Sequence, residues 1–162
     1  MVQPLASARP WTVSEGNHEK EKIPLFTDTF QSYNARWKMS FKESGTTSNL
    51  YYSFEVAEVH VIMLGFYTDY DELSDQYSWL KVDRKKTPFL VVLFHVPRYN
   101  RNNAHQGEGD GMMAAMEPLL YGAGVDLVLA GHVHAYEHSK RVNNGKSDPC
   151  GAVHIIVGDG GN

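Results

Sequence analysis

Two histidines separated by one residue, His132 and His134, follow the apolar run at residues 125–130. In an extended segment, residues i and i+2 point to the same side, so these two imidazoles could reach one metal ion or a close pair of ions. Neutral imidazole is a common ligand of zinc and also suits iron. The alternative is a pair of ordinary polar loop residues, and the pattern alone leaves both interpretations open.

Polar residues with ligand or acid–base chemistry also follow two other apolar runs. Asn17 and His18 come shortly after residues 11–13, and His95 comes directly after residues 89–94. Asn17 could instead cap a helix, and His95 could be a satisfied histidine at the end of a strand. The repeated placement of such residues after apolar runs favours a shared site more strongly than any single histidine does.

The polar segment 101–111 contributes His105 and, three residues later, Glu108. A solvated loop histidine is the alternative interpretation there. Three further histidines lack such neighbours and are interpreted as structural or surface residues: His60, His138 and His154. The string Gly158-Asp159-Gly160-Gly161 is interpreted as a glycine-rich turn, because it lacks the Lys-Ser/Thr pair of a phosphate-binding P-loop.

The predicted secondary-structure elements that position these residues are alternating strands and helices. The apolar runs at 11–13, 89–94, 125–130 and 154–157 are typical of strands buried on both faces. Residues 51–56 and 59–64 could form two strands around a turn at Ala57-Glu58. Helical spacing is found at 71–86 and at 111–121, where Pro118 limits the prediction, and 27–49 is interpreted as a long loop. The alternation predicts a layered α/β fold, in which ligands gather beyond the carboxyl ends of the strands.

The composition is that of one globular domain spanning 1–162, with 42% apolar and 21% charged residues. The apolar runs are too short to cross a bilayer, so no membrane contact is predicted. The net charge of −4 and the lack of a basic cluster beyond residues 81–86 argue against nucleic acid as a partner. Cys150 is the only cysteine, which excludes an internal disulfide, and the first residues lack the pattern of a signal peptide.

The amino-acid sequences of several segments resemble those of a known protein family. Gly16-Asn17-His18-Glu19, His95 after its apolar run, and Gly131-His132-Val133-His134 resemble the last three of the five metal-binding blocks of calcineurin-like metallophosphoesterases. The longer strings resemble plant purple acid phosphatases: Phe94-His95-Val96-Pro97, Ser32-Tyr33-Asn34-Ala35-Arg36-Trp37 and Gly131-His132-Val133-His134-Ala135-Tyr136-Glu137. The similarity covers essentially the whole chain.

The resemblance implies two metals, ferric iron with zinc, manganese or ferrous iron, and a metal-bound hydroxide that attacks the phosphorus of a small phosphate monoester. By that analogy, Asn17, His95 and His132 bind the divalent metal and His134 binds the ferric ion. His18 and His105 would contact the phosphate or protonate the leaving alcohol, with Glu108 nearby. Members of the family are secreted, extracellular or vacuolar, and a homodimer is compatible with the resemblance.

The chain also departs from the family pattern, because the two upstream blocks, Gly-Asp-x-Gly and Gly-Asp-x-x-Tyr, are not found before Trp11. Those blocks supply two aspartates and the iron-binding tyrosine. We therefore expect a partial metallophosphoesterase catalytic domain that lacks its first strands and their metal-binding loops. Such a chain should hold at most one weakly bound divalent metal, show no purple colour and have very low phosphatase activity. A catalytically inactive metal-binding or structural remnant, and a phosphodiesterase of the same superfamily, remain alternatives.

Overall fold

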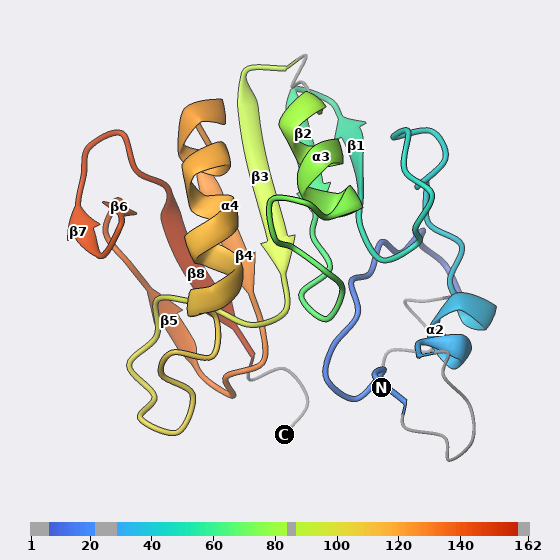
Figure 1. The fold of residues 1–162 in the computed structure, drawn as a ribbon, viewed down its shortest axis with the longest axis horizontal. Coiled ribbons are helices and arrows are strands. Elements are labelled where there is room, and N and C mark those ends of the chain that lie inside the picture. Colours follow the sequence, from blue (N-terminus) through green and yellow to red (C-terminus); the bar gives the residue numbers. More distant parts are fainter. Residues whose placement is uncertain (1–6, 22–28, 84–86, 159–162) are drawn as a thin grey trace.

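A computed structural model describes residues 7–21, 29–83 and 87–158 of the chain. In these ranges, six strands form one sheet in the order β1-β2-β3-β4-β8-β5 (Figure 1). Strands β2, β3, β4 and β8 are parallel, and β1 and β5 join them as antiparallel edges. The bounds are Tyr52–Val56 (β1), Val59–Met63 (β2), Phe89–Phe94 (β3), Leu127–Ala130 (β4), Tyr136–His138 (β5) and Val153–Val157 (β8). A separate short hairpin pairs Val142–Asn143 (β6) with Lys146–Ser147 (β7).

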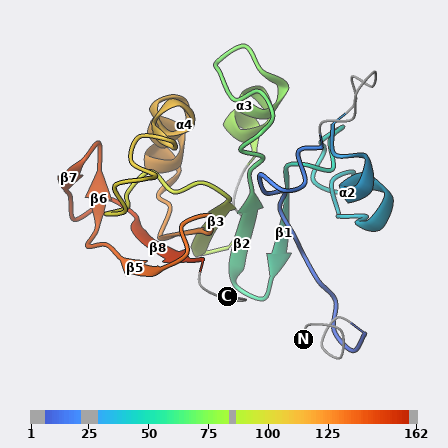
Figure 2. The same ribbon diagram turned by 90° about the horizontal axis from the view of Figure 1, so that it is seen from below.

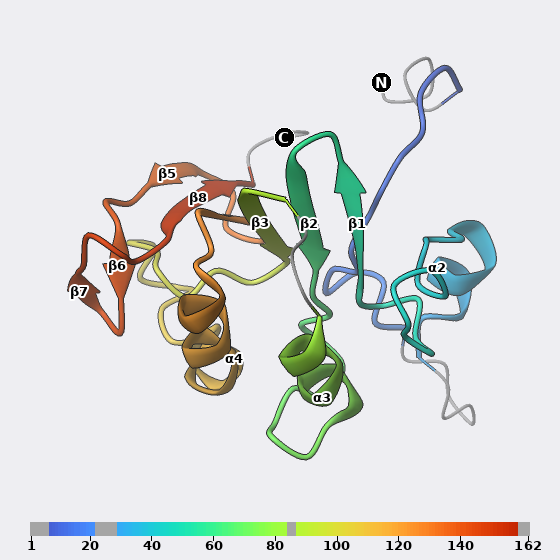
Figure 3. The ribbon, with the colours of Figure 1, turned by 90° about the horizontal axis from the view of Figure 1, so that it is seen from above.

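Two of the described helices, Asp75–Val82 (α3) and Asp110–Ala123 (α4), lie on the same side of the sheet, as Figure 3 shows. Helix α3 begins at a serine cap, where Ser74 accepts a hydrogen bond from the Tyr77 backbone N–H. Helix α4 continues through Pro118, which lies on its exposed side, and ends where Gly124 adopts a left-handed φ of 71°. This layered α/β arrangement confirms the predicted fold class.

The core lies between these helices and one face of the sheet. Leu90 and Val92 of β3 are buried with Met112 and Met116 of α4. The opposite face is also apolar but only partly covered: its residues of intermediate exposure include Val61, Val91, Leu93, Leu129 and Ile155. The expectation of strands buried on both faces is therefore met on one face only, because the two helices α3 and α4 both lie on that side.

Residues 11–13 form no strand, which corrects the prediction for that segment. The Val13 carbonyl accepts hydrogen bonds from the phenols of Tyr33, at 2.9 Å, and Tyr52, at 2.7 Å. Side chains therefore satisfy a backbone group that a neighbouring strand would otherwise satisfy. Residues 17–19 form a turn rather than the capped helix considered as an alternative for Asn17.

The predicted long loop at 27–49 contains a short helix, Gln31–Arg36 (α2). The end of the helix predicted at 71–86 and most of the glycine-rich string lie outside the described residues, at 84–86 and 159–161. The hairpin predicted around Ala57 is present, with Ala57 in a left-handed conformation at a φ of 51°. In the described ranges, no helix has the combination of length and apolar character that crossing a bilayer requires.

The parallel strands bring their carboxyl ends to one edge of the sheet, onto which Figure 2 looks. Phe94 pairs with Ala130, and Ala130 pairs with Ile156, so β3, β4 and β8 end at nearly the same level. The next residue after β3 is His95, whose carbonyl accepts a hydrogen bond from the Gly131 backbone N–H at 3.0 Å. Polar residues that are far apart in the sequence thereby meet at this edge.

Candidate functional site

A pocket of about 520 Å³ lies at this edge of the sheet, and we call it the histidine pocket. Its walls come from the turn at 17–19, the ends of β3, β4 and β8, and the loop before α4. Six of the seven residues predicted for the site line it, and the seventh, Glu108, contacts two of them. The six are Asn17, His18, His95, His105, His132 and His134.

The three side chains predicted to share a divalent metal form a continuous series of contacts. Asn17 Oδ1 lies 2.9 Å from His95 Nε2, and His95 Nε2 lies 3.2 Å from His132 Nδ1. The imidazole rings of His95 and His132 meet edge to face, with centroids 5.0 Å apart. His134 lines the same pocket. The assignment of these residues to particular metals stays a prediction.

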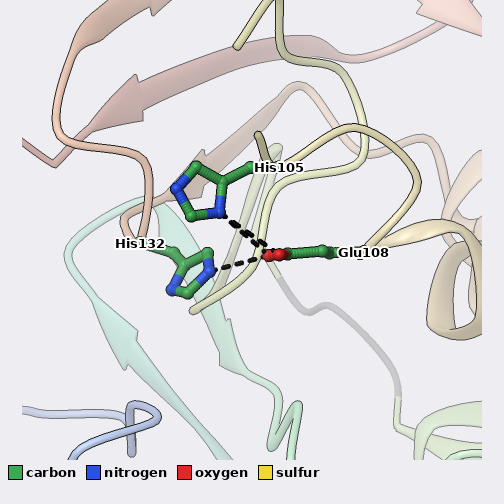
Figure 4. A group of neighbouring side chains, drawn as sticks. All are labelled: His105, Glu108 and His132. Atoms are coloured by element: carbon green, nitrogen blue, oxygen red, sulfur yellow. Dashed lines mark hydrogen bonds and ion pairs between the residues drawn. The ribbon is translucent and has the colours of Figure 1, made fainter. Parts of the chain in front are cut away.

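A second group of donors involves the carboxylate of Glu108. Its Oε2 atom lies 2.8 Å from His132 Nε2 and 3.2 Å from His105 Nδ1. In Figure 4 both imidazoles point toward this carboxylate. One donor atom from each residue lies within 4.8 Å of the others. Two imidazoles and a carboxylate form a donor set that suits zinc, iron or manganese. His132 belongs to both groups, so the histidine pocket offers nitrogen and oxygen ligands on two sides of one imidazole.

The segment that carries the two neighbouring histidines is not extended, which corrects the geometric assumption made from the sequence. His132 has a φ of 61°, in the left-handed region. Consecutive tight turns follow, in which the Val133 N–H donates to the Gly131 carbonyl and the Ala135 N–H donates to the Val133 carbonyl, each at 2.7 Å. A non-glycine residue in this conformation costs on the order of 1–3 kcal/mol, and such strain is concentrated at functional sites.

Glycines bring the backbone close to the ligands at two points. A Cβ atom on Gly16 would lie 2.9 Å from His95 Cε1, so a side chain there would displace the imidazole. A Cβ atom on Gly158 would overlap the carbonyl oxygen of Val133, the residue between the two histidines. The motif Gly16-Asn17 and the glycine after β8 are therefore required by close packing around the pocket.

Burial and neighbouring charges shift the titration of two residues of the site. Burial, together with the charges of His132 and His18 and against the opposing charge of Glu19, lowers the pKa of His95 to about 4. His95 is therefore neutral in mildly acidic solution, as a metal ligand must be. Desolvation raises the pKa of Glu108, but hydrogen bonds from His105 and His132 outweigh it, so the net shift is downward. Glu108 is therefore ionised and can only accept hydrogen bonds.

Glu15 is a residue of the site region that sequence reasoning missed. It is fully buried, and its Oε1 accepts a hydrogen bond from the Tyr67 backbone N–H at 3.1 Å. Among the described residues, its Oε2 has no hydrogen-bond partner. Burial raises the pKa of Glu15 to about 7. In the sequence, a glutamate between Ser14 and Gly16 looks like an ordinary exposed loop residue. Its burial results from the packing of the 65–68 loop against it, which the sequence does not indicate.

Tyr67 connects this carboxyl to the histidine pocket. Its ring centroid lies 6.0 Å from that of His95. Burial raises the pKa of the Tyr67 phenol to about 12, with smaller contributions from the negative charges of Glu108 and Glu15. The phenol is therefore protonated over the whole range in which the imidazoles titrate.

Comparison with known proteins relates this geometry to one family. A family model described as calcineurin-like phosphoesterase matches residues 1–136. Purple acid phosphatase 18 and purple acid phosphatase 22 of Arabidopsis thaliana are 72% and 62% identical to the chain, each over 100% of its length. A purple acid phosphatase of Glycine max is 40% identical over 94% of the chain. The chain spans 38%, 39% and 37% of the length of these three relatives.

A solved structure supports the fold independently. Purple acid phosphatase PPD1 from yellow lupin seeds superposes with a TM-score of 0.80, over 98% of this chain and 32% of the lupin chain. The sequence identity of 22% makes this a similarity of fold alone. The fold of the chain is therefore one already seen in an experimental structure.

Proposed function

The chain belongs to the calcineurin-like phosphoesterase family and resembles plant purple acid phosphatases along its whole length, and from this premise we propose that it hydrolyses small phosphate monoesters at the histidine pocket. The observation that supports the proposal most directly is the contact series Asn17–His95–His132, which continues through Glu108 to His105. The chain spans less than two fifths of the length of these relatives. The proposal is therefore that the residues of the histidine pocket contribute to phosphate ester hydrolysis.

We assign the metal ligands by combining the donor set with the family resemblance. Asn17, His95 and His132 would hold a divalent ion, and His134 would contribute to a ferric ion. When bound, such ions polarise phosphoryl oxygens and make water a stronger nucleophile. The nitrogen and oxygen donors in the pocket fit zinc, manganese or iron, which is the chemistry that this proposal requires.

The remaining residues of the pocket would handle protons and the substrate oxygens. Because ionised Glu108 can only accept hydrogen bonds, the proton of a neutral His105 lies on Nδ1, and Nε2 is left to face a substrate. His18, exposed in the turn at 17–19, lines the same pocket. A protonated imidazole at either position would offset the phosphate charge and could donate a proton to the leaving oxygen.

The decisive experiment measures phosphate release from p-nitrophenyl phosphate by the full chain supplied with iron and zinc. Replacing Asn17 by Ala should reduce turnover and metal content together. Glu108→Gln should reduce turnover by up to about 10²–10⁴-fold, the usual range for the proton transfer that His105 would perform, because the loss of the carboxylate charge weakens the contact that orients His105. Matched controls are Asn103→Ala and Glu72→Gln, which change exposed residues outside the pocket. Unchanged turnover in Asn17→Ala, or hydrolysis that survives complete chelation, would contradict the proposal.

The same assay separates the alternatives. A phosphodiesterase would release nitrophenol faster from bis(p-nitrophenyl) phosphate than from the monoester. A metal-binding or structural remnant would take up metal without hydrolysing either compound. From the family resemblance, we also propose that the protein is secreted or vacuolar.

A further inference from the structure

A larger cavity, of about 800 Å³, lies on the flank of the histidine pocket. We call it the cationic cavity, because three of the side chains that line it are positively charged. Its walls are formed by the loop after β3, by β5 and the segment after it, and by the β6–β7 hairpin. The residues used in the argument are Tyr99, Arg101, Tyr136, Glu137, Lys140 and Arg141.

The two cavities share their walls at two places in the chain. Arg101 lines the cationic cavity, and the next residue, Asn102, lines the histidine pocket. Likewise, Tyr136 lines the cationic cavity, and His134, two residues earlier, lines the histidine pocket. The loop is also tied internally, because Asn100 Nδ2 donates to the His105 carbonyl at 3.2 Å. The cationic cavity therefore adjoins the histidine pocket along the 100–105 loop and along the 134–136 segment.

The cavity is positive in a protein that is negative overall. Three cations and one carboxylate line it, which leaves a net charge of +2 with histidines neutral, whereas the whole chain carries −4. Among the described residues, none of the three cations forms an ion pair, and Arg141 Nη1 donates to the Gly151 carbonyl at 3.0 Å. Both oxygens of Glu137 instead accept from the Arg101 backbone N–H, at 2.9 and 3.2 Å.

The floor of the cavity is held by hydrogen bonds. The Tyr99 hydroxyl donates to Glu117 Oε1 of α4 at 2.6 Å and accepts from the Gly145 N–H of the β6–β7 hairpin at 2.9 Å. The Tyr99 ring also meets His154 edge to face, with centroids 4.8 Å apart. Such a fixed floor, with cationic side chains that form no ion pair among the described residues, is suited to an anionic ligand.

We propose that the cationic cavity binds a second phosphate group of the substrate whose scissile phosphate lies in the histidine pocket. This inference rests on the proposed function and takes His105, rather than His18, as the group that protonates the leaving oxygen, so that the leaving group lies toward the loop at 100–105. Arg101, from the loop after β3, and Lys140, from the segment after β5, contact the second phosphate. The preferred substrates are then esters that carry two or more phosphates, and Tyr136, 62% exposed at the rim, packs against the organic part that joins them.

The kinetic test compares a sugar bisphosphate with the corresponding sugar monophosphate. Arg101→Gln and Lys140→Gln should each raise KM for the bisphosphate by about fivefold, the effect of one exposed charge contact, and the loss should shrink at high salt. The KM for the monophosphate should stay unchanged. Lys146→Gln is the matched control, because Lys146 is an exposed lysine of β7 that does not line the cavity. Equal effects on both substrates would overturn the inference.

A binding test without turnover separates this inference from the proposed function. An alkane-1,5-bisphosphonate, which is not hydrolysed and spaces its two phosphorus groups about as far apart as a sugar bisphosphate does, is titrated calorimetrically into the chelator-treated full chain. Its affinity should fall in the Arg101→Gln, Lys140→Gln double variant and stay unchanged in Lys146→Gln. If the full chain hydrolyses no monoester but this pattern holds, the proposed function fails and the anion site survives. If inorganic phosphate binds as tightly as the bisphosphonate, or if the double variant binds normally, the two-phosphate subsite is rejected.

Discussion

Glu15 is fully buried next to the Gly16-Asn17 turn, and its two carboxyl oxygens are used unequally. One oxygen accepts the Tyr67 backbone N–H, and the other has no partner among the described residues. Burial raises the pKa of this carboxyl from 4.5 to about 7. The folded protein therefore keeps Glu15 protonated at a pH where the unfolded chain ionises it. The contribution of this group to stability is complete below pH 4.5 and is lost as the pH rises to about 7.

Replacing Glu15 by Gln should therefore stabilise the protein at pH 7 and leave its stability nearly unchanged at pH 4. The gain at pH 7 should approach an upper limit of about 3 kcal/mol, because each unit of pKa shift corresponds to about 1.4 kcal/mol. Urea unfolding of the metal-free chain at the two pH values measures it. Exposed Glu72→Gln serves as the control and should show no such difference. A Glu15→Gln effect that is equal at both pH values would show that burial does not perturb the carboxyl.

His154 has the opposite dependence on pH. Burial lowers its pKa from 6.5 to about 4, and the charge of Arg98 adds to the shift. The folded protein keeps the imidazole neutral while the unfolded chain protonates it. Its contribution to stability is therefore present above pH 6.5 and is lost as the pH falls through about 4.

His154→Phe should remove part of the acid sensitivity of the fold while keeping the ring contact with Tyr99. Between pH 7 and pH 4, the unmodified chain should lose up to about 3 kcal/mol of unfolding free energy relative to the variant. The measurement is urea unfolding across this range, with exposed His138→Phe as the control. If the unfolding free energies of His154→Phe and the unmodified chain changed with pH in the same way, the lowered pKa of His154 would be refuted.

At the level of elements, the pocket depends on how closely the end of β8 approaches the turn after β4. Gly158 follows β8 directly, and its Cα lies against the carbonyl of Val133. Val133 is itself completely buried between the two histidines of the turn. Any side chain at position 158 must therefore push the 131–135 segment away from the sheet, and with it His132 and His134.

Gly158→Ala should destabilise the protein by about 1–3 kcal/mol, the range for overpacking a tight contact. Gly122 offers a matched control within α4, because a Cβ atom there meets nothing within 4 Å. Gly122→Ala should instead stabilise the protein by about 0.5–1 kcal/mol, since alanine loses less backbone entropy in a helix. Thermal unfolding of both variants gives the comparison. Equal melting temperatures would mean that the 131–135 turn yields without strain.

At the scale of the whole molecule, the histidine pocket is completed only when four distant segments meet, three of which carry the assigned metal ligands. The turn at 17–19, the end of β3, the loop before α4 and the turn after β4 contribute to the histidine pocket. The unfolded chain does not hold these segments together. Metal binding should therefore be coupled to folding, and it requires neutral imidazoles, so it should weaken in acid.

Addition of zinc should raise the melting temperature, with a stabilisation of about 2.7 kcal/mol when the free ion reaches a hundred times its dissociation constant. The shift should be larger at pH 7 than at pH 5, and it should fall in Asn17→Ala and His95→Ala. Asn103→Ala is the control and should respond like the unmodified chain. Differential scanning calorimetry with metal analysis measures both quantities. A zinc-dependent shift that persists in Asn17→Ala and His95→Ala would place the ion elsewhere.

Much of the fold could be predicted from local patterns. The apolar run at 89–94 forms β3 with the expected bounds, and the segments on either side of Ala57 form the expected hairpin. The strand predictions succeed because the apolar pattern of a short segment indicates both its secondary structure and which of its faces is buried. The run at 11–13 failed because a strand also needs a neighbour, and the Val13 carbonyl is bonded by two tyrosines instead.

The sequence by itself determined the chemistry at the sheet edge, since residue types and their positions after apolar runs are local properties. Only the tertiary structure decided which atoms meet. The position of Glu108 between His105 and His132, the left-handed turn at His132 and the burial of Glu15 all depend on contacts between loops. These contacts between loops depend on the order of the strands in the sheet and on how closely neighbouring backbone segments approach. A short stretch of sequence encodes neither the strand order nor these close approaches. The cationic cavity has the same origin, because Arg101 and Lys140 come from separate loops that only the folded sheet brings together.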